Sequence, residues 1–316
     1  MRTILERPVV VGVDGSQDAI RAVEFAALEA ERLGCGVWIV AAVHEIAAYP
    51  SVAPLLTGES MIDVGRGIVA DASRAAEGRA PTVPLDASVV VGAASTILAE
   101  AGRQGRMIVL GHRDTDLLEH VFTGSTTIGV VGRATCPVVS VPASWSRDRT
   151  HGRVIAAVDG STIAPAVLTC ALEAAEAHDA DVTVLHYWDV NELYSPFGDI
   201  KAAQREWETT AGSRIKTLLD QLTPRYPGVR ARLELEYARP ADALVRRSGD
   251  VDRIVMGRHG GTSLLAGIIA LAPGGVARAL LQHARCPVEV VPSPVVGVSP
   301  ETMDEVAAVE AADAAG

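Results

Sequence analysis

The feature that most constrains this chain is an internal repeat. The stretch VVVGVDGSQDAIRAVEFAALEAERLG begins at Val9, and a similar stretch, VIAAVDGSTIAPAVLTCALEAAEAHDA, begins at Val154. Each contains an apolar run that ends in Asp-Gly-Ser, at Asp14 and Asp159, and then apolar residues at helical spacing. The same pattern of a strand, a sharp turn and a helix occurs twice, 145 residues apart. This repeat indicates a duplicated unit.

Later landmarks of the two halves also match. A second apolar strand follows, GVWIVAAVHE or DVTVLHYWDV, and each half closes with a helix and a Cys-Pro strand, RATCPVVSVP or HARCPVEVVP. The aspartate of the turn lies 97 residues before Gly111 in the first half and 98 before Gly257 in the second. Cys136 and Cys286 are 150 residues apart, so about four residues are inserted late in the second half.

The order of these elements predicts the fold class. Continuous Val, Ile and Leu runs are typical of buried parallel strands, and their alternation with helices predicts α/β domains with helices on both faces of a parallel sheet. A chain of 316 residues, 48% apolar, suits two domains of roughly 150 residues each. We expect domains at 1–142 and 153–292, a polar linker at 143–152, and an acidic, mobile tail at 293–316.

Composition narrows the possible partners. A net charge of -11 disfavours nucleic acid or an anionic membrane as partner. The N-terminus has no signal-peptide pattern and no stretch approaches 18 uninterrupted apolar residues, so we expect a cytoplasmic protein without a membrane span. The four cysteines form no CxxC pair and no metal-ligand spacing, which favours buried, reduced thiols, with no metal site expected: Cys35, Cys136, Cys170 and Cys286.

The candidate site follows from the sheet. Ligands of open parallel sheets bind beyond the carboxyl ends of the strands, which places Asp14, Val43 and Gly111 around one crevice. A carboxylate there can bond a sugar hydroxyl or a base amine. Gly124, Ser125 and Thr126 open a helix whose N-terminal amides and hydroxyls would face an anion.

Simpler interpretations of the same residues stay open. In the simplest interpretation, Gly124 and Ser125 serve only to begin and cap a helix. Ser16 and Ser161 sit where a helix N-cap belongs, so part of the Asp-Gly-Ser signal is turn and cap chemistry. His112 and Arg113 directly follow Gly111 and are further candidates for ligand contacts, although a loop histidine is usually solvated.

In this order the motifs resemble the universal stress protein family. The landmarks are a valine-rich strand, Asp-Gly-Ser, a helix, a segment of the type Gly-x2-Gly-x9-Gly-Ser/Thr and a CPV strand, and they span residues 8–142 and 153–292. The resemblance implies two tandem doubly wound five-stranded parallel-sheet domains and, in the nucleotide-binding branch of the family, an ATP site. Carried over by position, the binding residues are Asp14, Gly111, Gly124 and Ser125 in the first half, and Asp159, Gly257, Gly260 and Gly274 in the second.

Both halves depart from the family's pattern. In the first, Asp114 replaces the second glycine, and an anion about 4 Å from a phosphate costs on the order of 1 to 4 kcal/mol unless it points outward or shares a bound Mg²⁺. In the second, Arg258 and His259 suit a phosphate, but thirteen residues separate Gly260 from Gly274. Gly275 there replaces the hydroxyl residue and loses a hydrogen bond worth roughly 1 kcal/mol.

These observations predict a stress-response protein that binds ATP, with or without Mg²⁺, and acts as a sensor or regulator with little or no catalysis. The sequence contains no GxxxxGK[ST] phosphate loop. The alternative is a nucleotide-free scaffold that works through dimerisation and partner binding, using the apolar insert near Leu264 to Leu271. We expect a homodimer in either case.

Overall fold

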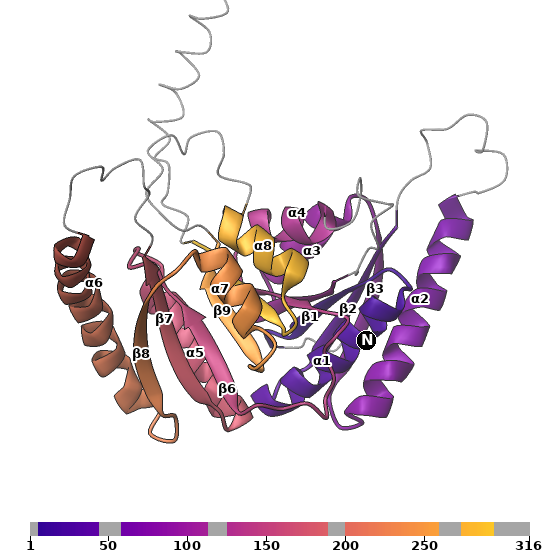
Figure 1. The fold of residues 1–316 in the computed structure, drawn as a ribbon. Helices are drawn as coiled ribbons and strands as arrows, with labels where there is room; N and C mark the ends of the chain where they lie inside the picture. Colours follow the sequence, from indigo (N-terminus) through magenta and orange to yellow (C-terminus); the bar gives the residue numbers. More distant parts are fainter. Residues whose placement is uncertain (1–5, 44–57, 113–124, 189–199, 259–272, 294–316) are drawn as a thin grey trace, which may run out of the picture.

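The computed structural model describes residues 6–43, 58–112, 125–188, 200–258 and 273–293. All ten strands form one sheet, in the order β3-β2-β1-β4-β5-β10-β9-β6-β7-β8 (Figure 1). The expected tail at 293–316 lies, except for its first residue, outside the described residues, and so does the apolar insert near Leu264.

The two halves repeat one order of elements. The first contains β1 (Val9–Val13), α1 (Gln17–Leu33), β2 (Val37–Val43), α2 (Gly58–Arg79), β3 (Leu85–Val91), α3 (Ala94–Gly102), β4 (Met107–Gly111), α4 (Ser125–Arg133) and β5 (Val138–Val141). The second contains β6 (Arg153–Ala157), α5 (Ala164–His178), β7 (Asp181–Trp188), α6 (Ile200–Leu222), η2 (Thr223–Arg225), β8 (Ala231–Tyr237), α7 (Pro240–Arg247), β9 (Arg253–Gly257), α8 (Gly275–His283) and β10 (Val288–Val291).

Within each half the strands are parallel, and the halves join at one antiparallel pair. Val138 of β5 pairs with Val290 of β10, and Ser140 pairs with Val288. The predicted α/β class, with five parallel strands per half, is confirmed. The continuous ten-stranded sheet was not part of the prediction.

Helices cover the two faces of this sheet differently. On one face, α3, α4, α7 and α8 bury a single core that includes Ile108 of the first half and Ile155 and Ile254 of the second. On the other face, α1 and α2 cover one core, and α5 and α6 cover a separate one (Figure 1). No helix in the described ranges is long and apolar enough to cross a membrane.

The Asp-Gly-Ser turns explain why each first strand ends where it does. Gly15 and Gly160 have φ of 82° and 73°, a conformation that glycine adopts without strain. In the first half Ser16 is the N-cap of α1, since its Oγ accepts a bond from the Ala19 N–H at 3.1 Å.

The same prediction for Ser161 is wrong. If Ser161 were the N-cap, its hydroxyl would accept a hydrogen bond from the Ala164 N–H. That N–H instead donates to the Ser161 carbonyl at 3.1 Å. The next residue, Pro165, has no N–H. Relative to its Asp-Gly-Ser turn, helix α5 therefore begins two residues later than α1 does. Within the described structure the Ser161 hydroxyl is buried without a hydrogen-bond partner.

A buried ionic cluster joins the halves beside the seam. Arg253 of β9 donates to Glu29 of α1 at 2.6 Å and to Glu289 of β10 at 3.1 Å, and His178 Nε2 lies 2.7 Å from Glu29. Burial would raise the pKa of Glu29, but Arg253 and His178 outweigh it and hold that pKa below its usual range. Removing one partner would leave buried charge uncompensated and destabilise the contact between the halves.

Candidate functional site

Each half has a cavity at the carboxyl ends of its strands. The cavity of the first half has a volume of about 120 Å³, and Asp14, Gly111 and Thr126 line it together. Its walls are apolar and come from β2, α3 and β4, with Val40, Leu98 and Leu110 among the lining residues. The structure thus brings the predicted carboxylate, the strand-end glycine and the start of α4 to one crevice, which we call the first crevice.

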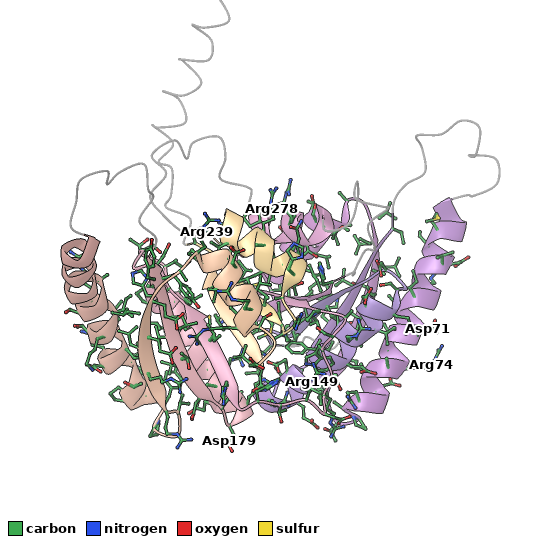
Figure 2. All side chains as sticks on the ribbon, in the orientation of Figure 1. Asp71, Arg74, Arg149, Asp179, Arg239 and Arg278 are labelled. Carbon is green, nitrogen blue, oxygen red and sulfur yellow. The ribbon has the colours of Figure 1, made fainter. Side chains whose placement is uncertain are left out.

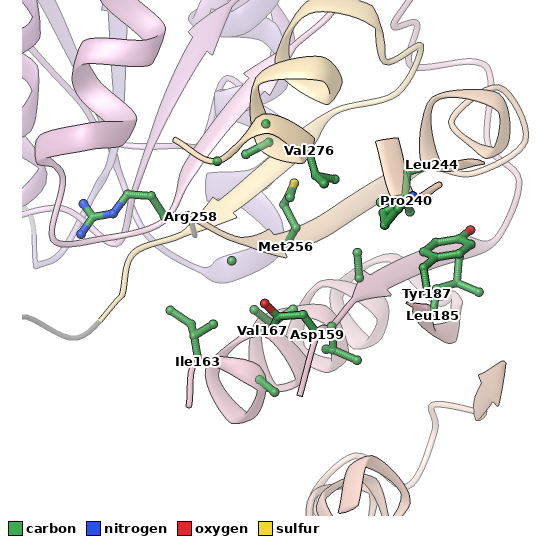
Figure 3. A pocket seen from close by; sticks show the side chains of 17 residues that line it. Asp159, Ile163, Val167, Leu185, Tyr187, Pro240, Leu244, Met256, Arg258 and Val276 are labelled. Atoms are coloured by element: carbon green, nitrogen blue, oxygen red, sulfur yellow. The ribbon is translucent and has the colours of Figure 1, made fainter. Parts of the chain in front are cut away.

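The corresponding cavity of the second half, the second crevice, is larger. It has a volume of about 250 Å³ and is lined by the predicted residues Asp159, Gly257, Arg258, Gly274 and Gly275. Figure 3 shows Asp159 between Ile163 and Val167 on one side and Met256 on the other. Most of the remaining lining is apolar: Leu185, Leu244 and Val276 belong to it.

The two aspartates have a structural task as well as a place at the rim. Asp14 Oδ1 accepts a bond from the Ser16 N–H at 3.0 Å, and Asp159 Oδ1 accepts from the Ser161 N–H at 3.1 Å. Both residues are exposed. Each carboxylate therefore stabilises its turn while standing at the mouth of its crevice.

Val43 ends β2 as expected, but its side chain does not line the first crevice. Alternation along β2 turns Val40 and Ala42 toward the first crevice, whereas the Val43 side chain is buried on the opposite face, where a Cβ added at Gly65 of α2 would meet it at 3.0 Å. The Val43 carbonyl accepts a bond from the Gly92 N–H at 2.9 Å.

Arg258 has its backbone at one crevice and its side chain in the other half. Its guanidinium donates to the carbonyls of Gly132, at 2.8 Å, and Val131, at 3.3 Å, at the end of α4. Figure 3 shows this side chain pointing away from the other labelled lining residues. Burial lowers the pKa of Arg258. The carbonyl of Arg258 also accepts the Gly274 N–H at 3.1 Å, so that amide is already used.

Other predicted residues are placed in part or not at all. His112 is half-buried and its N–H donates to the Val141 carbonyl at 2.8 Å, but it does not line the first crevice. Ser125 is the first residue of α4. Arg113, Gly124 and Gly260 lie outside the described residues, so their roles stay predictions.

Tyr187 is a lining residue that the sequence analysis missed. It occupies the place in β7 that Ala42 occupies in β2, and it lines the second crevice. Its hydroxyl is buried and lacks a hydrogen-bond partner in the described part of the chain. Burial raises the pKa of Tyr187 to about 12, so the hydroxyl stays protonated. Figure 3 shows this hydroxyl on the side of the ring away from Met256 and Asp159. Aligning the second strands and counting by twos from Leu185 would have found it.

Gly111 is required by packing. A Cβ at this position would lie 2.3 Å from the carbonyl oxygen of Asp18, at the start of α1. Gly275, at the start of α8, has no atom within 4 Å of such a Cβ. Gly111 therefore allows β4 to lie close to α1, whereas the space around Gly275 is open.

The cysteines agree with their expected packing role. Cys136 and Cys286 are buried and the other two are half-buried, all as free thiols. Burial raises the pKa of Cys136 to about 11 and that of Cys286 to about 12, so both stay protonated. Among the described residues, no group of three or more His, Cys, Asp or Glu side chains could hold a metal ion.

Comparison with known proteins agrees with this geometry. The model of the family described as "Universal stress protein family" matches residues 6–142 and again residues 150–292. The chain belongs to the universal stress protein family. It carries two domains of that family in tandem, as the sequence motifs predicted.

Individual relatives match over almost the whole chain. A universal stress protein of Mycobacterium tuberculosis (strain ATCC 25618 / H37Rv) is 29% identical over 288 residues, which cover 89% of this chain and 95% of that protein. One from Mycolicibacterium smegmatis is 26% identical and covers 92% of this chain and 99% of its own length. The crystal structure of a universal stress protein from Archaeoglobus fulgidus has the same fold, with a TM-score of 0.64 at 17% identity over 91% of this chain and 98% of that one.

Proposed function

We propose that this universal stress protein binds an adenine nucleotide, ATP in the first instance, and acts as a sensor or regulator of the stress response with little or no catalysis. One observation carries the proposal. In each half a rim carboxylate and the start of a helix line the same cavity at the carboxyl ends of parallel strands, which is where open α/β sheets bind nucleotides.

The residues of the first crevice suit the two ends of a nucleotide. The Asp14 carboxylate can accept bonds from ribose hydroxyls or the base amine. Across the cavity, α4 begins with Ser-Thr-Thr, and Thr126 and Thr127 line the crevice. A helix N-terminus directs amide N–H groups and positive dipole toward an anion, so we place the phosphates at this end.

The second crevice supports the proposal less well. Helix α8 begins with Gly-Val-Ala, so it offers no side-chain hydroxyl in its first three residues. The Arg258 guanidinium is engaged by α4. We therefore propose that the first crevice is the main nucleotide site. The homodimer expected from the sequence would present two such sites.

The test is the nucleotide content of the freshly purified protein, released by denaturation and identified by chromatography, followed by calorimetric titration of ATP into the emptied protein. We expect adenine nucleotide in the released fraction and saturable binding of ATP. Absence of both nucleotide and titration heat would overturn the proposal and favour the alternative, a scaffold that works through its surfaces.

A further inference from the structure

A third cavity lies where the halves meet, at the end of the sheet opposite to the two crevices, near the amino ends of the strands. We call it the junction cavity. It has a volume of about 230 Å³ and is walled by the last turns of α1, the linker from Ser144 to Gly152, and the second-half segments that lead into β7, β9 and β10. Figure 2 shows Arg149 at this end of the molecule, low in the view and between the halves, whereas Arg239 and Arg278 lie at the opposite end, high in the view.

The lining of the junction cavity is basic although the chain as a whole is acidic. It includes four arginines, two histidines and two aspartates: Arg32, Arg147, Arg149, Arg285, His151, His178, Asp179 and Asp252. The chain carries a net charge of -11. A local excess of guanidinium groups in a concave site of such a protein favours an anionic ligand.

Three of these guanidinium groups have no carboxylate partner among the described residues. Within the described structure, no carboxylate lies within 4.0 Å of the side-chain nitrogens of Arg147, Arg149 or Arg285. The fourth, Arg32, is paired with Glu29 at 3.2 Å. The anionic group that would complement the other three is therefore not supplied by described parts of the chain.

The half-buried acid of the lining has another task. Asp252 accepts bonds from the N–H groups of His151, at 2.6 Å, and Arg153, at 2.8 Å. Its carboxylate thereby holds the end of the linker against the loop before β9. Asp179 is exposed at the end of α5, so among the lining residues one further carboxylate stands against three guanidinium groups. Asp148, between Arg147 and Arg149 in the sequence, is exposed and does not line the cavity.

Side-chain and backbone contacts fix the linker against both halves. Trp145 packs edge-on against Phe25 of α1, with ring centroids 5.4 Å apart. Ser144 Oγ donates to the Arg285 carbonyl at 2.9 Å, which ties the linker to the second half. The Arg149 N–H donates to the Ser146 carbonyl at 3.2 Å and forms a tight turn. These contacts position Arg147 and Arg149 beside Arg285.

We propose that the junction cavity is a second ligand site that binds a compact polyanion of the oligophosphate class. Guanidinium groups bind phosphate oxygens through paired N–H bonds, and Ser146 and Thr150 add hydroxyl donors to the lining. The ligand would bridge the linker and the second half.

The experiment is a calorimetric titration of sodium tripolyphosphate into the full-length protein at low ionic strength. The test variant is Arg147→Gln with Arg149→Gln, and a second variant is Arg285→Gln. The matched control is Arg239→Gln with Arg278→Gln, which removes the same charge at the opposite end of the molecule. All five arginines are exposed, so the variants are expected to keep the wild-type melting temperature.

We expect saturable binding by the wild-type protein, at least tenfold weaker binding by each junction variant, and wild-type affinity in the control. Equal affinity in the wild-type protein and the junction variants would overturn the proposal, and so would a loss confined to the control, which would place the phosphates at the crevices. Absence of heat at millimolar tripolyphosphate would overturn it too. Because the probe has no adenosine, this result is independent of ATP binding in the first crevice.

Discussion

The two crevices share a framework but differ in lining. Both have an aspartate in an Asx turn at the end of the first strand, a glycine at the end of the fourth, and a helix that starts at the cavity. The first is lined at its helix by Thr126 and Thr127, and the second by Val276 and Ala277. The cavities measure about 120 and 250 Å³.

This difference separates what the fold requires from what a ligand requires. The aspartate and the turn glycine appear in both halves because they end a strand and form a turn, whichever ligand binds. The residues that face the cavity are free to differ, and of the two helix starts that of the first half supplies threonine hydroxyls. Ligand specificity is therefore expected to follow the lining rather than the repeated motif.

The largest effect expected from breaking this framework is on stability. Gly111→Ala would place a Cβ 2.3 Å from the Asp18 carbonyl oxygen and force α1 away from β4, which we expect to lower the free energy of unfolding by about 3 kcal/mol. Gly275→Ala, with open space around it, is the control and should change stability by less than about 1 kcal/mol. Denaturant unfolding of both variants measures this, and equal stabilities would contradict the packing argument.

Exchanging the helix starts should change nucleotide affinity. Thr126→Val with Thr127→Ala gives the first crevice the residues of the second, and we expect about tenfold weaker ATP binding, since each lost hydrogen bond is worth roughly 1 kcal/mol. The matched control is Thr217→Val on α6, whose hydroxyl bonds its own helix. ATP titrations of both variants check the prediction, which fails if the double variant binds as the wild-type protein does.

Tyr187 sharpens the comparison because its counterpart, Ala42, has no polar group. A buried hydroxyl without a partner destabilises the fold, so we expect Tyr187→Phe to raise the free energy of unfolding by about 1 kcal/mol. Tyr226→Phe, at a half-buried position outside the crevices, serves as the control and should have little effect. If Tyr187→Phe destabilised the protein, its hydroxyl would have to have a partner.

The smallest expected effect is a pH dependence of the second half. His186 is buried in β7, with Nδ1 2.7 Å from the Val158 carbonyl, at the place of Ala41 in β2. Burial lowers the pKa of His186, so the unfolded chain takes up its proton at a higher pH than the folded one. Stability should therefore fall as the pH drops below the usual histidine range near 6.5.

That pH effect can be isolated with a variant. We expect the loss of unfolding free energy between pH 7.5 and pH 5.5 to be smaller in His186→Leu than in the wild-type protein. Denaturant unfolding at the two pH values measures the difference. An unchanged loss would show that His186 does not contribute to it.

Much of this architecture could be predicted from the sequence because local patterns determine it. The Val-rich runs and the Asp-Gly-Ser turns gave the strands, and the rule for open sheets brought Asp14 and Gly111 to one crevice. Features that depend on partners distant in sequence could not be predicted. The pairing of β5 with β10, and the bonds from Arg258 to the end of α4, both join the two halves.

The orientation of the Val43 side chain and the start of α5 both have local causes in the sequence. The position of Val43 at the end of a strand predicts a place at the crevice, but alternation along β2 directs the side chain of Ala42 there. Ser161 was assigned as an N-cap by analogy with Ser16, although Pro165 changes how that helix begins. Position along a strand or in a motif does not by itself determine where a side chain points.

The central claim is that the first crevice is the main nucleotide site, and a matched pair of variants tests it most directly. Asp14→Asn and Asp159→Asn each keep the oxygen that accepts the turn N–H while removing the charge. The measurement is the calorimetric titration of ATP into both variants and the wild-type protein. We predict about tenfold weaker binding for Asp14→Asn and wild-type affinity for Asp159→Asn. Weaker binding for Asp159→Asn alone, or no binding by the wild-type protein, would contradict the claim.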